Sequence, residues 1–199
     1  MANVSEKFGL RPYKSLNGAP WNNAQNRYTI AANYGTAIFQ GDLVVPVAAG
    51  NIERYDVTAS SGAVKPIGVF NGVFYTDPTT KKPTFRDHFP ASLSPGDGIA
   101  FVADDPNQLF IAQQDSAAAN IVAAALNLNA DLVFGAGSTT TGMSGVEIDS
   151  SSKNTTATLQ VRLIDFYDVP SNDATANNSI LVVKINNHQL GSHTGTAGV

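Results

Sequence analysis

The chain has 199 residues, a formal net charge of −4 and no cysteine. Charged residues make up only 14% of it, below the roughly 25% usual in soluble globular domains, whereas hydrophobic residues make up 43%. The lack of cysteine excludes disulfides and thiolate metal sites, and no window reaches the roughly 20 apolar residues of a membrane span. Charged groups are costly to desolvate, and a surface with few of them loses little free energy when it is covered. The composition therefore favours packing against other protein subunits. A monomer with a neutral surface is the alternative.

The first 25 residues show neither the period of a strand nor that of a helix, yet they contain aromatic residues, in which disordered tails are poor. Up to residue 30, four basic residues and one acidic residue give a net charge of +3, which leaves −7 on the rest of the chain. This basic charge is too sparse for a nucleic-acid site but suits an acidic neighbour. We expect residues 1–25 to form an extended N-terminal arm that packs either on a neighbouring subunit or, equally, on its own domain. The residues of the arm expected to bind a partner are Phe8, Arg11, Tyr13 and Trp21.

From residue 26 onward, short β-prone runs alternate with turn residues. The predicted strands are 27–30, 37–47, an imperfect alternation over 52–57, then 64–75, 98–103, 108–112, 156–167 and 179–185. Gly41-Asp42 interrupts the second run as a turn or bulge. Asn71-Gly72 splits the fourth as a hairpin turn, because both residues tolerate positive φ. The run 179–185 is continuously apolar, so we expect a strand that is central or covered on both faces.

The connections carry signals of their own. Residues 76–95 contain several prolines and predict a long binding or mobile loop, and Asp104–Asn107 predicts a turn between two strands. The stretch 135–145 is rich in Gly, Ser and Thr and predicts a loop that is flexible or ordered by a partner. One short helix is predicted by a capping Asp-Ser pair followed by apolar residues at helical spacing: Ala118, Ile121, Val122, Ala125 and Leu126.

These elements predict a mainly β chain, an antiparallel β-barrel or sandwich with one short helix and an extended N-terminal arm. The arm spans residues 1–25, a single β domain spans 26–190, and 191–199 form a frayed C-terminal tail.

The sequence contains no pattern typical of an active site. The three histidines, His88, His188 and His193, fit none of the usual zinc-ligand spacings, so solvated or capping roles are expected for them. The carboxylates of Asp104-Asp105 are explained by turn chemistry, and no phosphate-binding glycine motif is present. We therefore expect no enzymatic activity, no catalytic residue, no cofactor and no metal.

Several stretches resemble a family of tailed-bacteriophage virion structural proteins. They run from Phe8-Gly9-Leu10-Arg11-Pro12 and Gly18-Ala19-Pro20-Trp21-Asn22 through Gly41-Asp42-Leu43-Val44, Asp104-Asp105-Pro106-Asn107-Gln108-Leu109-Phe110 and Gly137-Ser138-Thr139-Thr140-Thr141-Gly142 to Val183-Lys184-Ile185-Asn186-Asn187-His188. The resemblance spans nearly the whole chain without a catalytic motif. Some proteins of this kind, similar in size and composition, are capsid cement, or decoration, proteins.

The resemblance implies a homo-oligomeric capsid decoration protein on the exterior of the virion, assembled in the bacterial host cytoplasm. Its implied partners are the major capsid protein and copies of itself, with a trimer as one arrangement, and neither nucleic acid nor membrane. A tail or head–neck component is one alternative. A host-glycan binding module is another, with sugar held by the loops 75–89 and 135–145 and with Phe85 and Phe89 as stacking aromatics.

Overall fold

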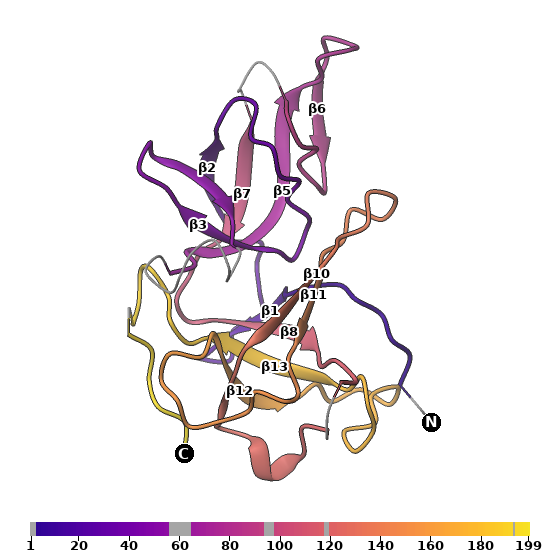
Figure 1. The fold of residues 1–199 in the computed structure, drawn as a ribbon, viewed down its shortest axis with the longest axis vertical. Helices are drawn as coiled ribbons and strands as arrows, with labels where there is room; N and C mark the ends of the chain where they lie inside the picture. The colour runs from indigo at the N-terminus through magenta and orange to yellow at the C-terminus, as the bar shows by residue number, and fades with distance from the viewer. Residues whose placement is uncertain (1–2, 56–64, 94–97, 118–119, 193) are drawn as a thin grey trace.

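The computed structural model describes residues 3–55, 65–93, 98–117, 120–192 and 194–199. In these ranges the chain is mainly β, as predicted, and its strands form two parts placed one above the other in Figure 1. The strands are β1 (Arg11–Ser15), β2 (Asn26–Ile30), β3 (Leu43–Pro46), β4 (Asn51–Arg54), β5 (Gly68–Thr76), β6 (Pro83–Arg86), β7 (Ile99–Ala103), β8 (Gln108–Gln113), β9 (Asn129–Ala130), β10 (Leu132–Gly135), β11 (Gly145–Ile148), β12 (Val161–Phe166) and β13 (Ile180–Ile185).

The upper part in Figure 1 is a small barrel. Its sheet has the order β3-β4-β2-β7-β5-β6, and an additional pairing of β3 with β5 closes the first five of these strands into a ring. All pairings in this sheet are antiparallel except that of β2 with β4. Strand β5 shows why the barrel forms: Phe70, Val73 and Tyr75 are at most 2% exposed and point into the barrel core, whereas Phe74 between them points outward.

The lower part is a five-stranded antiparallel sheet with the order β1-β8-β13-β12-β9. One face of this sheet packs against the hairpin of β10 and β11 in a sandwich-like arrangement. The hairpin rises from the sheet, and its tip reaches toward the barrel (Figure 1), where Gln40 forms a bridge with Met143. The barrel strands all lie between residues 26 and 103, so the barrel is an insertion between β1 and β8.

The two parts share one hydrophobic core. Leu43, Val69 and Ala103 of the barrel belong to the same buried cluster as Phe110 of β8 and Val183 of β13. Strand β13 is paired on both sides and is buried along most of its length, which confirms the prediction for residues 179–185.

Several local predictions need correction. Asn71-Gly72 is not a hairpin turn, because β5 continues through it: Asn71 is an extra residue that forms a bulge against β7, and Gly72 has a φ of 140°. The predicted loop 76–95 contains β6, which starts at Pro83 at the edge of the sheet, where a proline is tolerated. The strands around Asp104–Asn107 form as predicted, but they belong to different sheets, so this turn connects the two parts.

The predicted short helix is wrong as an α-helix in the described residues. Only a single 3-10 turn, Ala123–Ala125, forms there, without a side-chain cap. The backbone at Val122 and Leu126 is extended, and the Ile121 N–H is bound by the Gln114 side chain instead of by a helical carbonyl. Residues 118 and 119 lie outside the described residues.

The C-terminal segment is not frayed. The Gly198 N–H donates to the Thr155 carbonyl, the Val199 N–H donates to the Asn127 carbonyl, and Arg162 binds the Thr196 carbonyl at 2.7 Å. These contacts hold the described residues of 191–199 against the lower sheet, because the exposed backbone groups find partners on β12 and its flanking loops.

Candidate functional site

The residues expected to bind a partner through the N-terminal arm contact the chain's own lower sheet. Phe8 is half-buried and packs with Leu109 and Val182 on the face of that sheet opposite the main core. Arg11 stacks on Phe8, with its Cζ 4.9 Å from the ring centroid. Phe8 and Arg11 thus contact residues of their own chain, which agrees with the alternative that the arm packs on its own domain.

The remaining part of the expected arm is also tied to the chain. Tyr13 meets Tyr167 edge-to-face, with ring centroids 5.3 Å apart, and 36% of the residue remains exposed. Trp21 is half-buried and donates its indole N–H to the Ala24 carbonyl. Because β1 pairs with β8 and the preceding Leu10 is fully buried, residues 1–25 include an edge strand of the lower sheet and are not a free arm.

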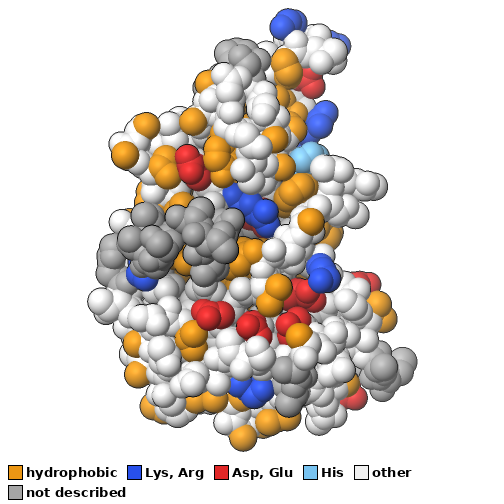
Figure 2. Space-filling model, in the orientation of Figure 1, with side chains coloured by type: hydrophobic (Ala, Val, Ile, Leu, Met, Phe, Trp, Pro, Cys, Tyr) orange, Lys and Arg blue, Asp and Glu red, His pale blue; other side chains and the backbone are white. Residues whose placement is uncertain are grey.

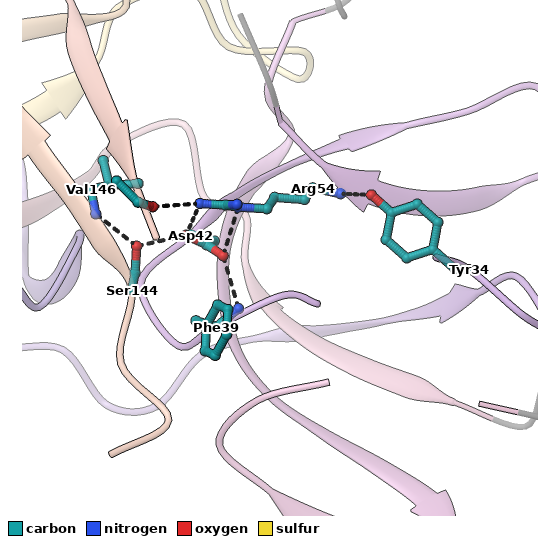
Figure 3. A network of polar contacts seen from close by, with 7 residues as sticks. Tyr34, Phe39, Asp42, Arg54, Ser144 and Val146 are labelled. Carbon is teal, nitrogen blue, oxygen red and sulfur yellow. Dashed lines mark hydrogen bonds and ion pairs between the residues drawn. The ribbon is translucent and has the colours of Figure 1, made fainter. Parts of the chain in front are cut away.

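A buried polar network joins the hairpin tip to the barrel (Figure 3). Asp42, fully buried, accepts hydrogen bonds from the Ser144 hydroxyl at 2.6 Å and the Phe39 N–H at 2.8 Å, and its Oδ2 lies 3.0 Å from Arg54 Nε. Arg54 also donates to the Gly135 carbonyl at 3.1 Å. Burial raises the pKa of Asp42, while Arg54 and the hydrogen bonds act in the opposite direction. The network thus links residues just before β3 and at the end of β4 of the barrel to the hairpin of β10 and β11.

Other carboxylates and histidines also have partners within the chain. Asp104 is 7% exposed and accepts a hydrogen bond from the Tyr28 hydroxyl at 2.6 Å, and Glu147 forms an ion pair with Lys7. His188 is buried and accepts the Leu190 N–H, which is a capping role. His88 stacks on Phe39 with ring centroids 5.6 Å apart. His193 lies outside the described residues.

The outer surface of the barrel carries an aromatic face that the sequence analysis did not identify. We define it as Arg27, Phe74, Phe85, Ile99 and Phe101, whose cross-strand pairing places them side by side on β2, β7, β5 and β6. Phe74 and Phe85 are 41% and 57% exposed. The rings of Phe85 and Phe101 lie 5.8 Å apart, and the Arg27 guanidinium lies 6.0 Å from the Phe101 ring. Period-2 alternation along β5 was the available signal, but the expected hairpin at Asn71-Gly72 concealed it.

A groove of about 300 Å³ lies beside this face, between the end of β6 and the tip of the β10–β11 hairpin. Its lining residues are Phe85, Arg86, Asp87, His88, Thr139, Thr140, Thr141 and Gly142. The two loops considered for sugar binding therefore meet. Phe89 is only 1% exposed and belongs to the barrel core, so it cannot stack on a ligand, whereas Phe85 can.

Comparison with protein families, curated proteins and solved structures finds no match to this chain. Within the described residues, no three His, Asp or Glu side chains gather where they could hold a metal ion. The described part of the chain also contains no helix that is long and apolar enough to cross a bilayer.

The visible surface has no large field of one charge. In Figure 2, basic and acidic side chains lie in small separate groups between broad uncharged areas, and hydrophobic side chains are scattered among them. The aromatic face offers exposed apolar area for contact with another protein, and the groove offers polar groups beside an aromatic ring for a small ligand.

Proposed function

We propose that this chain is a non-enzymatic structural subunit of a tailed-phage virion, a capsid cement protein that binds the major capsid protein on the exterior of the head. The aromatic face carries the proposal. It exposes Phe74 and Phe85 to solvent on two paired strands, and large aromatic side chains contribute much of the energy of protein interfaces.

A contact of this kind is weak by itself but can hold a subunit on a shell in which it is repeated many times. Burying one large aromatic side chain stabilises a contact by about 1.5–3 kcal/mol. Two phenylalanines supply only a modest affinity, but the same contact recurs at every symmetry-related position of a capsid. The low charge of the chain, 14% of residues, keeps the desolvation cost of covering the surrounding surface small.

The aromatic face replaces the N-terminal residues as the proposed partner-binding surface. Phe8 is half-buried against the lower sheet and Arg11, itself exposed, stacks on it, so both already have a partner within the chain. Tyr13, at 36% exposure, and Leu16, at 51%, are exposed apolar residues in and just after β1, and we assign them to contacts between copies of this chain, including a trimer.

The test uses purified virions of the encoding phage and compares Phe74→Ser with Leu190→Ser. Leu190 is 57% exposed but lies in the loop after β13, outside the aromatic face. Phe74→Ser is expected to weaken attachment to particles by about tenfold or more, since one buried phenyl ring is lost, while Leu190→Ser binds as the wild type does. Full occupancy by Phe74→Ser would contradict the proposed surface.

The number of copies per particle separates this proposal from its rival. A cement protein is present in hundreds of copies, as a rough figure set by shell symmetry, whereas a tail or head–neck component is present in about tens or fewer. Quantitative mass spectrometry of purified virions measures this number directly. A count in the tens would favour the tail or head–neck role, and absence from virions would overturn both.

A further inference from the structure

The groove between β6 and the hairpin tip has features of a ligand site that subunit packing does not explain. It lies beside the aromatic face and shares only Phe85 with it. Its volume of about 300 Å³ is at the lower end of the range for small-molecule sites, roughly 300–1,000 Å³. A groove of this size suits a short ligand bound at the surface.

The wall formed by the hairpin tip is held in place before any ligand arrives. The Ser138 N–H donates to the Met143 carbonyl and the Gly142 N–H donates to the Ser138 carbonyl, which closes the tip on itself. The Gln40 N–H then ties the Gly142 carbonyl to the barrel at 2.9 Å. The loop is therefore ordered by the chain itself, and little conformational entropy remains to be lost on binding.

Gly142 fixes how closely the two walls approach. Its φ is 73°, a conformation that side-chain-bearing residues rarely adopt, and a Cβ at this position would lie 2.9 Å from the Cβ of Asp87. Asp87 and His88 therefore line one side of the groove, and the exposed Thr139 and Thr140 line the other. Hydrogen-bonding groups thus line both sides of the groove.

Phe85 is the apolar platform of the groove. Its ring packs against Phe101 and against the backbone at Gly72, so it is held in position while 57% of the residue remains exposed. It is the only aromatic residue among those that line the groove, apart from the imidazole of His88. One flat apolar surface beside several donors and acceptors matches a molecule with one C–H-rich face and many hydroxyl groups.

The charges of the groove disfavour an anionic ligand. Asp87 brings a carboxylate into it, and Arg86 is directed in part toward Asp77, whose Oδ2 lies 3.9 Å from Arg86 Nη2. Burial and the neighbouring Arg86 lower the pKa of His88, so its imidazole is neutral at pH 7. A phosphate or a nucleic acid would meet a carboxylate with no surplus of positive charge around it.

We propose that this groove binds a short, uncharged saccharide, with one sugar ring lying on Phe85 and its hydroxyls bonded to Asp87, His88 and the threonine hydroxyls. This site goes beyond the proposed structural role and does not depend on it. Phe85 belongs to both surfaces, so a capsid contact that covers Phe85 competes with the sugar, and the sugar is bound by the free chain.

The test is a glycan microarray of neutral and acidic oligosaccharides probed with the purified full chain, followed by calorimetric titration of the best neutral ligand. Inorganic phosphate is titrated in parallel as the probe for an anion site. We expect binding to neutral oligosaccharides and none to phosphate. The absence of any neutral ligand on the array, or a preference for phosphate or acidic glycans, would overturn the proposal.

Three variants locate the site. Phe85→Ala and Asp87→Asn are expected to lower the affinity for the neutral oligosaccharide by about tenfold or more, because they remove the platform and a charged acceptor. Leu190→Ala is the control: Leu190 is as exposed as Phe85, at 57%, lies in the loop after β13 and does not line the groove, so this variant should bind sugar as the wild type does. Unchanged binding by both Phe85→Ala and Asp87→Asn would also contradict the proposal. Sugar binding by Asp87→Asn and virion attachment by Phe74→Ser are separate readouts, so either inference can fail alone.

Discussion

Asp42 is the residue through which the hairpin tip is attached to the barrel. It precedes β3 and binds Ser144, near β11, and Arg54 at the end of β4, although more than 100 residues separate it from Ser144 along the chain. A buried carboxylate in such a position is stable only when its oxygens have partners. The network therefore also fixes the hairpin tip that forms one wall of the groove.

The raised pKa of Asp42 predicts how its contribution to stability depends on pH. Because folding raises this pKa above its ordinary value of 3.8, the folded chain holds the proton more tightly than the unfolded chain does. The contribution of Asp42 is therefore greatest below pH 3.8 and declines as the pH rises through the higher folded-state pKa. We expect the melting-temperature advantage of the wild type over Asp42→Asn to shrink as the pH is raised through this window. An advantage that grows with pH would show that the ion pair with Arg54 outweighs burial.

At the scale of residues, the sequence showed which residues matter but not whether each is buried or exposed, nor which partner it binds. Phe85 and Phe89 were both considered as exposed aromatics, yet Phe85 faces outward from an edge strand while Phe89 fills the barrel. Their exposure depends on β6 and on the bridge of Phe89 with Ile38, contacts that no local pattern encodes. Asp42 was interpreted as part of a turn or bulge, and nothing near it in the sequence indicates its partner Ser144.

Strand β1 is the element whose role differs most from the sequence prediction. It pairs with β8, and Leu10 just before it is fully buried in the core shared by both parts. Residues 1–25 were expected to form an extended arm outside the β domain, packed on a neighbouring subunit or on that domain. The structure instead includes β1 in the lower sheet, so removal of these residues exposes an edge of that sheet and the apolar residues that Phe8 covers.

Deletion of residues 1–25 is therefore expected to lower the melting temperature substantially, by roughly ten degrees or more for a loss of several kcal/mol. Circular dichroism on heating measures the effect. Deletion of residues 1–5 is the control, since it leaves Phe8, Leu10 and β1 in place, and it should cost much less. Equal melting temperatures for the wild type and the longer deletion would mean that β1 contributes nothing to the fold.

At the scale of elements, the strands were predicted where apolar runs are strong and bounded by turn residues, as for β2, β7, β8 and β13. The errors arose where one local sequence pattern is compatible with two different backbone structures. Asn-Gly suits a bulge as well as a hairpin, and the partner strand β7 selects the bulge. Apolar residues at helical spacing around Ile121 do not form a helix, because Ile121 is anchored by Gln114 and is buried against the lower sheet.

For the molecule as a whole, the shared core determines how it unfolds. Leu43 and Val69 from the barrel and Phe110 and Val183 from the lower sheet lie in one buried cluster, and the Asp42 network ties the same two parts together. We expect a single thermal transition in scanning calorimetry, with calorimetric and van't Hoff enthalpies in agreement. Two resolved transitions would show that the barrel and the lower sheet are energetically separate.

The sequence predicted the β class of the molecule but not its connectivity. Both sheets use ordinary strands, and what distinguishes them is which strands pair across long separations, such as β1 with β8 and β3 with β5. Periodicity reports which face of a strand is buried and is silent about its neighbour. The insertion of the barrel between β1 and β8 could therefore not be seen before the structure.

This insertion determines the order in which the two parts can fold while the chain is being synthesised. The barrel strands lie in one continuous stretch, so the barrel can close soon after β7 leaves the ribosome, but β1 must wait for β8, and the sheet is completed only when β13 emerges. At about 5–20 residues per second, β13 follows β1 by roughly 10–30 s. During that interval Phe8 and Leu10 have no completed sheet to cover them, and they are available to chaperones or to a neighbouring nascent chain. The lower sheet, and not the barrel, is thus the part of this molecule whose assembly depends on the speed of translation.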